Sequence, residues 1–334
     1  MKRGFNLQRK NNTNTENKMK KILGLLNDKI IISEEILEAI KDNKPIVSLE
    51  STIITHGLPY PVNIEVAYKC QQIIRENGAV PATIGIINGI PKIGISDDEI
   101  EFLSTNSQSC FKSSTKDIGY CYSKKLNAGT TVAATLFLSS LVGIECFATG
   151  GIGGVHRNAE KTFDISADIH ALSNYTGIVV CAGCKSILDI PKTIEILETY
   201  EITVLGFNTN QFPAFYSRNS GYNIQLEVND ENQIAQCYIF NKSLNFNSTI
   251  LVVNPIPEED EIPIEKISNL IDEAIAESIE KDICGKDVTP FLLERLSSLS
   301  KGQTLNANKS LIYNNVKLAS NISKNLKKLI NKIY

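Results

Sequence analysis

The chain has 334 residues, of which 42% are apolar and 21% charged, and its net charge is −3. Such a composition is typical of globular proteins and provides enough apolar side chains for a large core. No apolar run reaches membrane-spanning length and no basic patch with interleaved aromatic residues occurs, so we expect neither a membrane nor a nucleic acid as partner.

The first 27 residues differ from the rest of the chain. Seven Lys or Arg and one Glu occur before residue 22, around an Asn-rich centre. The segment lacks the apolar content for a core, and we predict a disordered basic extension. An organelle-targeting leader is the alternative, because the segment is basic and poor in acidic residues. Residues 28–334 are then expected to form one domain.

From residue 33 onward, helical and extended patterns alternate. Helices are predicted over 33–43, 63–78, 129–143 and 190–200, the last with Pro191 in its first turn, and the chain after residue 258 reads as helical. Strands are predicted over 45–51, 78–89, 91–96, 145–149, 177–183, 202–207 and 248–256. This alternation predicts a single α/β/α layered domain with a central mixed sheet, helices on both faces and a helical C-terminal segment.

Glu50 is the first candidate for chemistry. It stands at the end of the predicted strand in "VSLESTIITHG", where α/β folds place their active sites. The alternative is an exposed carboxylate at a strand end, which is common.

Two glycine-containing stretches resemble ligand-binding loops. "NAGTTVAATLFL" places two threonines before an apolar helix, and free N–H groups at such a start attract phosphate. An ordinary helix cap explains the same residues. "ATGGIGGVHR" does not match the dinucleotide-binding GxGxxG pattern, but its four glycines predict a close approach of the backbone to another group. His156 follows this loop and is one of only three histidines in the chain.

Acidic residues suggest a site for a hard metal ion. Asp164 and Asp168 in "FDISADIH" are four residues apart and share a face if the segment is helical. Their oxygens suit Mg²⁺ or Mn²⁺, and the alternative is a solvated acidic face. Structural zinc is not expected, because the single CxxC has no second pair of ligands in register.

The stretch "GIVVCAGCKSILD" offers two competing reactive groups. Cys181 and Cys184 form a CxxC pair at the end of an apolar run, as in a thiol redox site. Lys185 follows directly, and a partly desolvated lysine loses its proton more easily and can attack a carbonyl carbon. The eight cysteines do not cluster as in a secreted scaffold, so we expect mostly buried thiols in the cytoplasm.

Eight stretches together resemble the pseudouridine-5'-phosphate glycosidase family, also called the indigoidine synthase A family. They occur in the family's order and cover roughly residues 28 to 330: "VSLESTIITHGLPYP", "NAGTTVAATLFLS", "ATGGIGGVHR", "FDISADI", "KSILDIPKTIEILET", "FPAFYSRNSG", "GKDVTPFLL" and "NANKSLIYNN". Each stretch alone is a weak signal, but all of them in order are specific.

The resemblance implies a lyase-type enzyme that reversibly cleaves the C–C glycosidic bond of pseudouridine 5'-phosphate to uracil and ribose 5-phosphate. It also implies Mn²⁺ or another divalent cation such as Mg²⁺, an α/β/α body and a homotrimer. By motif, Glu50 resembles the proton donor, Lys185 the nucleophile that forms an imine with the opened sugar, and Asp164 the metal ligand. Residues that resemble substrate-binding or other active-site positions are Lys112, Val132, His156, Ser166, Ala167, Asp168 and Asn308.

Three stretches depart from the family pattern. "CAGCK" replaces a serine-glycine-alanine run before the lysine, "NTNQFPAFY" lacks an acidic residue, and "KGQTL" replaces a GGKS loop. None of them removes a matched catalytic residue, and the first creates the CxxC pattern. Two rivals stay open from the residues alone: a thiol redox protein that uses Cys181 and Cys184, and a non-catalytic nucleotide-sugar binding protein.

Overall fold

The computed structural model describes residues 29–283, 285 and 288–333. The predicted basic extension at residues 1–27 lies outside them, as do Cys284 and the Lys286-Asp287 pair of the "GKDVTPFLL" stretch. The strands are β1 (Ile31–Ile32), β2 (Ile46–Leu49), β3 (Val80–Ile87), β4 (Ile90–Ile93), β5 (Phe111–Ser113), β6 (Ala128–Thr130), β7 (Cys146–Ala148), β8 (Ile178–Cys181), β9 (Thr203–Phe207), β10 (Glu227–Val228) and β11 (Ile250–Val253).

These strands form one mixed sheet, as the sequence predicts. Its main order is β1-β4-β3-β2-β7-β8-β11-β9-β10, and β6 pairs with both β3 and β5. The strands from β3 through β10 in this order all run parallel, whereas β4 and β6 lie antiparallel to β3. Because β2, β7 and β8 are parallel neighbours, their carboxyl ends meet at one edge of the sheet.

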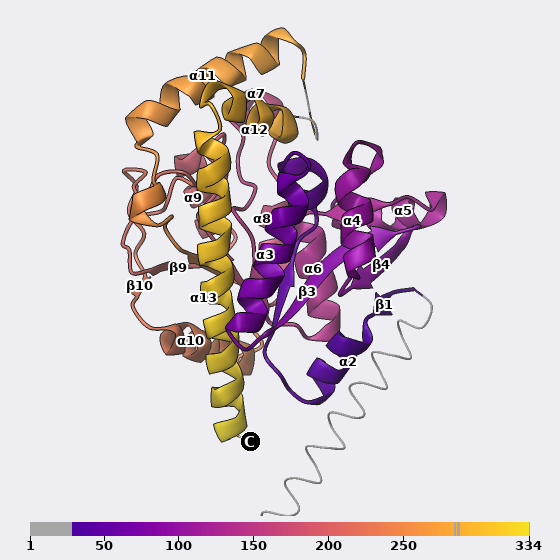
Figure 1. The fold of residues 1–334 in the computed structure, drawn as a ribbon. Coiled ribbons are helices and arrows are strands. Elements are labelled where there is room, and N and C mark those ends of the chain that lie inside the picture. The colour runs from indigo at the N-terminus through magenta and orange to yellow at the C-terminus, as the bar shows by residue number, and fades with distance from the viewer. Residues whose placement is uncertain (1–28, 284, 286–287, 334) are drawn as a thin grey trace, which may run out of the picture.

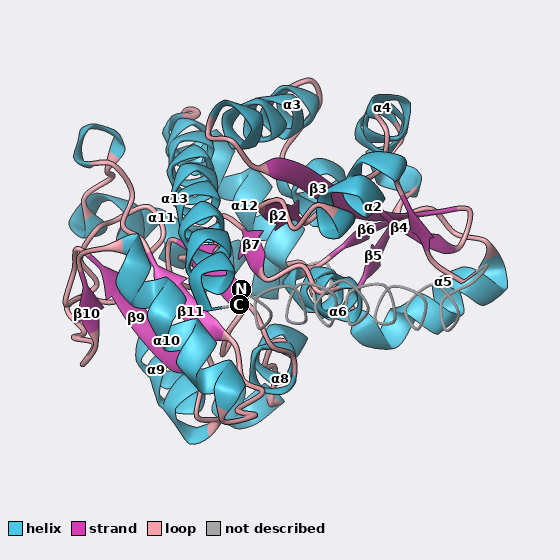
Figure 2. Cartoon of the chain, turned by 90° about the horizontal axis from the view of Figure 1, so that it is seen from below, coloured by secondary structure: helices cyan, strands magenta, loops and turns pink. Residues whose placement is uncertain are grey.

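Helices cover both faces of this sheet. They are α2 (Glu34–Lys41), α3 (Val62–Glu76), α4 (Asp97–Thr105), α5 (Ile118–Lys124), α6 (Val132–Val142), α7 (Ala159–Thr162), α8 (Ala167–Asn174), α9 (Ile190–Thr199), α10 (Glu231–Ser243), α11 (Ile264–Glu280), α12 (Val288–Leu299) and α13 (Gln303–Ile333). Helices α3 and α13 lie together on one side of the central strands, and α6 and α8 lie on the other (Figure 2). Within the described residues, no helix combines the length and apolarity that a membrane crossing requires.

Local sequence explains several element boundaries. Ser33 caps α2 by accepting a hydrogen bond from Ile36 N–H at 3.4 Å, and Asp189 caps α9, which has Pro191 in its first turn. Asn88 and Gly89 have φ values of 50° and 82°, the left-handed pair that a two-residue hairpin between β3 and β4 requires. The predicted helix over 129–143 is shorter than expected, because residues 128–130 form β6 and Thr131 is the cap of α6.

The long helix α13 runs the length of the molecule in front of the sheet, beside α3 (Figure 1). Its buried apolar residues include Leu311, Val316, Ala319, Ile322 and Leu326, which follow one another at intervals of three to five positions, the pattern of one buried face. The helical C-terminal segment is therefore an integral part of the core. The short strands β1, β5, β6 and β10, and helices α4, α5 and α10, were not predicted.

Candidate active site

All ten residues predicted to bind or react line one cavity of about 380 Å³. They come from seven separate segments between β2 and α13: Glu50, Lys112, Val132, His156, Asp164, Ser166, Ala167, Asp168, Lys185 and Asn308. A cavity of this size holds a small ligand such as a nucleoside phosphate. The fold therefore assembles the predicted residues, although their individual roles do not follow from their shared location.

The strand ends bring the two candidate reactive groups to one wall. Leu49 and Ala148 are partners in the β2–β7 register, so the next residues, Glu50 and Thr149, leave the sheet side by side. The Thr149 hydroxyl donates a hydrogen bond to Glu50 Oε1. Lys185 follows β8, the next strand, through the turn 182–184.

The environment of Glu50 favours its neutral form. Burial raises the pKa of Glu50 above its usual range, and the nearby Asp168 carboxylate acts in the same direction. The Lys185 ammonium, the Thr149 hydroxyl and Lys112 oppose this shift without cancelling it. A carboxyl group with a raised pKa can retain a proton and donate it to a reacting atom.

Lys185 is half-buried, and its Nζ donates a hydrogen bond to the Gly151 carbonyl oxygen at 2.8 Å. Its own backbone N–H donates to Ile152 O at 3.0 Å, so the glycine-rich loop holds the lysine at two points. The backbone and the ammonium group of Lys185 are thus both fixed, and its charge is near enough to Glu50 to lower the pKa of that carboxyl group. This arrangement places an amine and an acid within the same cavity wall.

The two cysteines before Lys185 are unsuited to redox chemistry. Cys181 and Cys184 are fully buried free thiols, and burial raises the pKa of each to about 12. A reactive cysteine needs a lowered pKa and solvent access. The structure gives the thiol redox alternative no support.

The glycine-rich loop packs closely against other segments of the chain. A Cβ atom on Gly151 would lie 2.6 Å from the Phe215 ring, on Gly153 2.2 Å from Ser166 Oγ, and on Gly154 2.4 Å from Thr193 Oγ1. These positions require glycine because neighbouring segments pack directly on the backbone. The close approach predicted from the sequence is therefore internal packing, and it seats the loop between the "FPAFY" and "FDISAD" stretches.

The Asp168 carboxylate lies at the start of helix α6, where the sequence pattern suggested a phosphate-binding site. Asp168 is 5% exposed, and its two carboxylate oxygens accept hydrogen bonds from Ala133 N–H at 3.0 Å and Gly153 N–H at 2.8 Å. The first of these N–H groups belongs to the first turn of α6. An internal carboxylate already satisfies it, so the expected phosphate cradle is at least partly filled by the chain itself.

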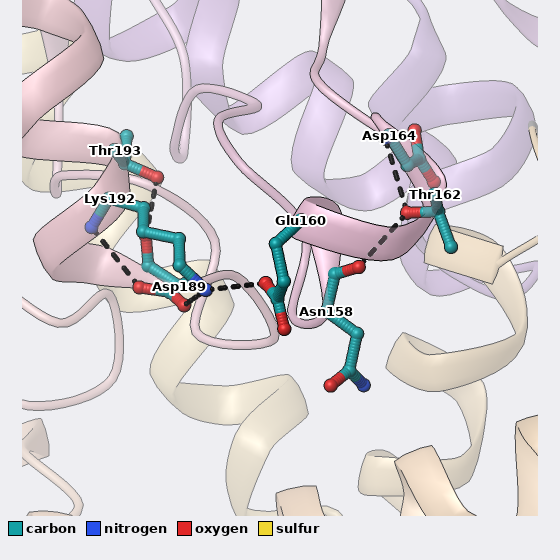
Figure 3. Close-up of polar contacts among 7 residues, drawn as sticks. All are labelled: Asn158, Glu160, Thr162, Asp164, Asp189, Lys192 and Thr193. Atoms are coloured by element: carbon teal, nitrogen blue, oxygen red, sulfur yellow. Dashed lines mark hydrogen bonds and ion pairs between the residues drawn. The ribbon is translucent and has the colours of Figure 1, made fainter.

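Asp164 and Asp168 do not share a helical face. Helix α8 begins at Ala167, so Asp164 lies in the preceding loop, and the condition under which the two residues would share a helical face is not met. The Asp164 N–H donates to Thr162 Oγ1 at 3.2 Å (Figure 3), and its carbonyl oxygen accepts from His156 N–H at 3.0 Å. Its side chain is 40% exposed and approaches His156 Nδ1 at 3.9 Å.

His156 is expected to be neutral near pH 7. Burial lowers the pKa of His156, Lys112 and Lys185 lower it further, and the Asp164 carboxylate opposes them. A neutral imidazole can accept or donate a hydrogen bond to a ligand in the cavity.

A tightly caged metal ion does not fit this donor set. Across residues 29–283, 285 and 288–333, no three His, Cys, Asp or Glu side chains are arranged to hold one. Asp164 is a single, partly exposed carboxylate, and both oxygens of Asp168 already accept backbone hydrogen bonds. One carboxylate does fit a hydrated Mn²⁺ or Mg²⁺ ion, which keeps several waters and shares substrate phosphates.

Three further predicted residues reach the cavity from separate elements. Lys112 comes from β5, Val132 from the first turn of α6, and Asn308 from the buried face of α13. Lys112 and Asn308 also line a neighbouring cavity of about 1410 Å³. The active-site cavity therefore adjoins a larger, more open space.

Sequence reasoning missed several cavity residues. They include Thr52, Ser114, Lys116, Thr149 and Phe215. Thr149 carried a usable signal, since it directly precedes the glycine-rich loop at a strand end. Phe215 did not, because its approach to Gly151 depends on the tertiary fold.

Comparisons with known proteins identify the relatives of this chain. A family model described as "Indigoidine synthase A like protein" matches residues 35–325. A Clostridium botulinum protein named pseudouridine-5'-phosphate glycosidase is 48% identical over 298 residues, covering 89% of this chain and 97% of the relative. A protein of the same name from Escherichia coli K12 is 44% identical over 298 residues, covering 89% and 96%.

Two solved structures share the fold. An indigoidine synthase A-like protein from Thermotoga maritima has a TM-score of 0.82 at 40% identity, covering 90% of this chain and 98% of that one. The prealnumycin C-glycosynthase AlnA, solved in complex with ribulose 5-phosphate, has a TM-score of 0.84 at 33% identity, covering 92% and 99%.

Proposed function

The chain belongs to the family of indigoidine synthase A-like proteins, and from this premise we propose that it is a pseudouridine-5'-phosphate glycosidase. The reaction is the reversible cleavage of the C–C glycosidic bond to uracil and ribose 5-phosphate. The observation that carries the proposal is the pairing, on one cavity wall, of a carboxyl group with a raised pKa and a half-buried lysine amine. Relatives that carry this name cover nearly the whole chain.

A carbon–carbon bond requires chemistry of this kind. The base leaves through a carbon atom, so protonating a glycosidic oxygen, as ordinary glycosidases do, does not release it. An amine bonded to C1' of the ring-opened sugar can instead push its lone pair into a C=N bond as the C1'–C5 bond breaks. The electron pair of that bond remains on C5 of the base, which must gain a proton.

In the proposed mechanism, Lys185 attacks C1' as the ring C1'–O4' bond opens, and the proton that the amine loses passes to O4'. Glu50 delivers the proton that uracil C5 receives when the C1'–C5 bond breaks. Water then hydrolyses the imine, releasing ribose 5-phosphate as the aldehyde and restoring the amine. Lys185 must be neutral to attack, and Glu50 must be protonated to donate. Burial of Glu50 favours the second condition.

Asp164 would hold a divalent ion such as Mn²⁺ within its water shell. When bound, the ion would neutralise negative charge near the substrate phosphate. The neutral His156 and the half-buried Lys112 line the same cavity and can donate hydrogen bonds to the substrate. We also infer a homotrimer, as the family resemblance implies; a measured mass three times that of the chain by light scattering would support it, and a monomer would contradict it.

An activity assay tests the proposed function. Purified protein with pseudouridine 5'-phosphate and Mn²⁺ should release uracil, and uracil with ribose 5-phosphate should be converted back. Both directions are followed by the ultraviolet spectrum of the base and by chromatography. Folded protein that binds the nucleotide without turnover in either direction would instead identify the non-catalytic binding protein.

A further inference from the structure

Asn315 is a buried amide on the largely apolar face of α13. It is 0% exposed, and its Nδ2 donates to Thr149 O at 2.8 Å and Gly150 O at 3.4 Å. Its Oδ1 accepts a hydrogen bond from Asn254 Nδ2 at 3.0 Å. One side chain of the C-terminal helix therefore holds two consecutive carbonyl groups of the segment that follows β7.

That segment carries contacts to both proposed reactive groups. The Thr149 side chain is the hydrogen-bond donor to the Glu50 carboxyl group, and the Gly151 carbonyl accepts from Lys185 Nζ at 2.8 Å. Asn315 contacts residues 149 and 150, between these two interactions. A change in the orientation of these peptides therefore alters the positions of acid and amine together.

Burial makes the amide of Asn315 hard to replace. A buried carbonyl that loses its donor costs about 1–3 kcal/mol, and an apolar side chain at position 315 leaves the Asn254 amide without its acceptor as well. The neighbouring Asn314 makes a comparable contact, with Nδ2 donating to Pro255 O at 3.1 Å, but that contact does not involve the cavity wall. A substitution at Asn314 therefore affects only the packing of α13, whereas a substitution at Asn315 also affects the segment that holds the site.

We propose that Asn315 and Thr149 are positioning residues for the reaction: Asn315 fixes the 149–151 segment, and Thr149 fixes the Glu50 carboxyl group. This inference rests on the proposed roles of Glu50 and Lys185. Neither residue touches the reacting atoms in this assignment. Their effect is on the orientation of the acid and the amine and on the ionisation of Glu50.

The hydroxyl of Thr149 stabilises the charged form of Glu50 and so lowers its pKa. Thr149→Val keeps the shape and removes the hydroxyl, so the pKa of Glu50 should rise further. The high-pH limb of the kcat/KM profile, where Glu50 loses its proton, should then move to higher pH. Thr149→Ser keeps the hydroxyl and should return this limb toward that of the unmodified protein.

Asn315→Leu should lower kcat by about 10- to 100-fold, as expected for a displaced catalytic group, and change KM by less than about threefold. Asn314→Leu is the matched control on the same helix and should keep kcat within about twofold, although it also loses a partly buried hydrogen bond. Melting curves of both variants measure the loss of stability that they share.

The proposal fails if Asn314→Leu lowers kcat as much as Asn315→Leu, or if Thr149→Val keeps both the kcat and the pH profile of the unmodified protein. If Asn315→Leu does not fold, the two Thr149 variants decide. A changed kcat and pH profile in Thr149→Val, restored in Thr149→Ser, supports the proposal. Equal kcat and equal pH profiles in the two variants overturn it. If the unmodified protein shows no turnover, the proposed function has failed. Carbon-13 NMR titration of the Glu50 carboxyl then tests the positioning claim without substrate, since Thr149→Val must raise its pKa.

Discussion

One wall of the cavity carries Glu50 and Lys185, and its rim carries Asp164. The side chains of the wall and of the rim are held by different kinds of contact. On the wall, Glu50 follows β2 and Lys185 follows β8, the strands on either side of β7, and their side chains are hydrogen-bonded to Thr149 and Gly151. On the rim, Asp164 is fixed through its backbone while its carboxylate is 40% exposed. Bond-making groups need a fixed position away from bulk water, whereas a hydrated ion needs room for its waters.

Lys185→Ala should have the largest effect, because it removes the amine that the mechanism uses as its electron sink. We expect a fall in kcat of at least about 10³-fold. Borohydride added during turnover should attach a ribose phosphate to the peptide that contains Lys185, and the adduct should be absent in the variant. Lys192, an exposed lysine that pairs with Glu160 outside the cavity (Figure 3), provides the control: Lys192→Ala should keep both activity and labelling. An adduct on another lysine contradicts the assignment.

Glu50→Gln should lower kcat by about 10²- to 10⁴-fold, the usual contribution of a general acid. The donor must be protonated, so activity should fall as pH rises through the raised pKa of Glu50, and glutamine should abolish this limb. Because the folded state favours the protonated form, the carboxylate destabilises the protein above that pKa. The glutamine variant should therefore melt at a higher temperature at pH 8. An unchanged pH profile would exclude Glu50 as the acid.

Asp164→Asn tests the rim and should have a smaller effect. Loss of the anchoring carboxylate should raise the Mn²⁺ concentration required for half-maximal activity by about 10- to 100-fold. Direct Mn²⁺ binding, measured by electron paramagnetic resonance, should weaken equally. Glu160→Gln alters an exposed carboxylate on the neighbouring helix α7 and should change neither quantity (Figure 3). Full activity in chelator with no bound metal would remove the ion from the mechanism.

The sequence was informative where local pattern decides structure. The helical and extended periodicities predicted the layered fold, and the strand-end position of Glu50 pointed to the site before any resemblance was considered. The roles of Asp168 and the glycine-rich loop were less accessible. The contacts of Gly151 with Phe215, and of Asp168 with α6, join segments far apart in the chain, so no local pattern encodes them.

The role of Asn315 could be predicted only in part from the sequence. Its position on the apolar face of α13 could have been recognised from the 3.6-residue period, since a polar side chain among Leu311, Val316 and Ala319 is an exception to that period. What the sequence does not reveal is the identity of its partners. The acceptors at Thr149 and Gly150 belong to a segment 165 positions earlier, brought there by the packing of α13 on β7 and β8.

Substitution of the two cysteines should have the smallest effect on activity, in contrast to substitution of the lysine beside them. Cys181 and Cys184 share a strand end with Lys185, yet they point into the core, where burial raises both thiol pKa values to about 12. A thiol also offers no imine electron sink. Cys181→Ala combined with Cys184→Ser should therefore fold and keep activity within about tenfold, a change of about 1.4 kcal/mol in the barrier that reflects packing around the lysine. Activity of the double variant should not depend on a reducing agent. A folded double variant as inactive as Lys185→Ala would assign the thiols a direct part in the reaction. It would contradict the conclusion that the two cysteines serve only the core while Lys185 serves the cavity.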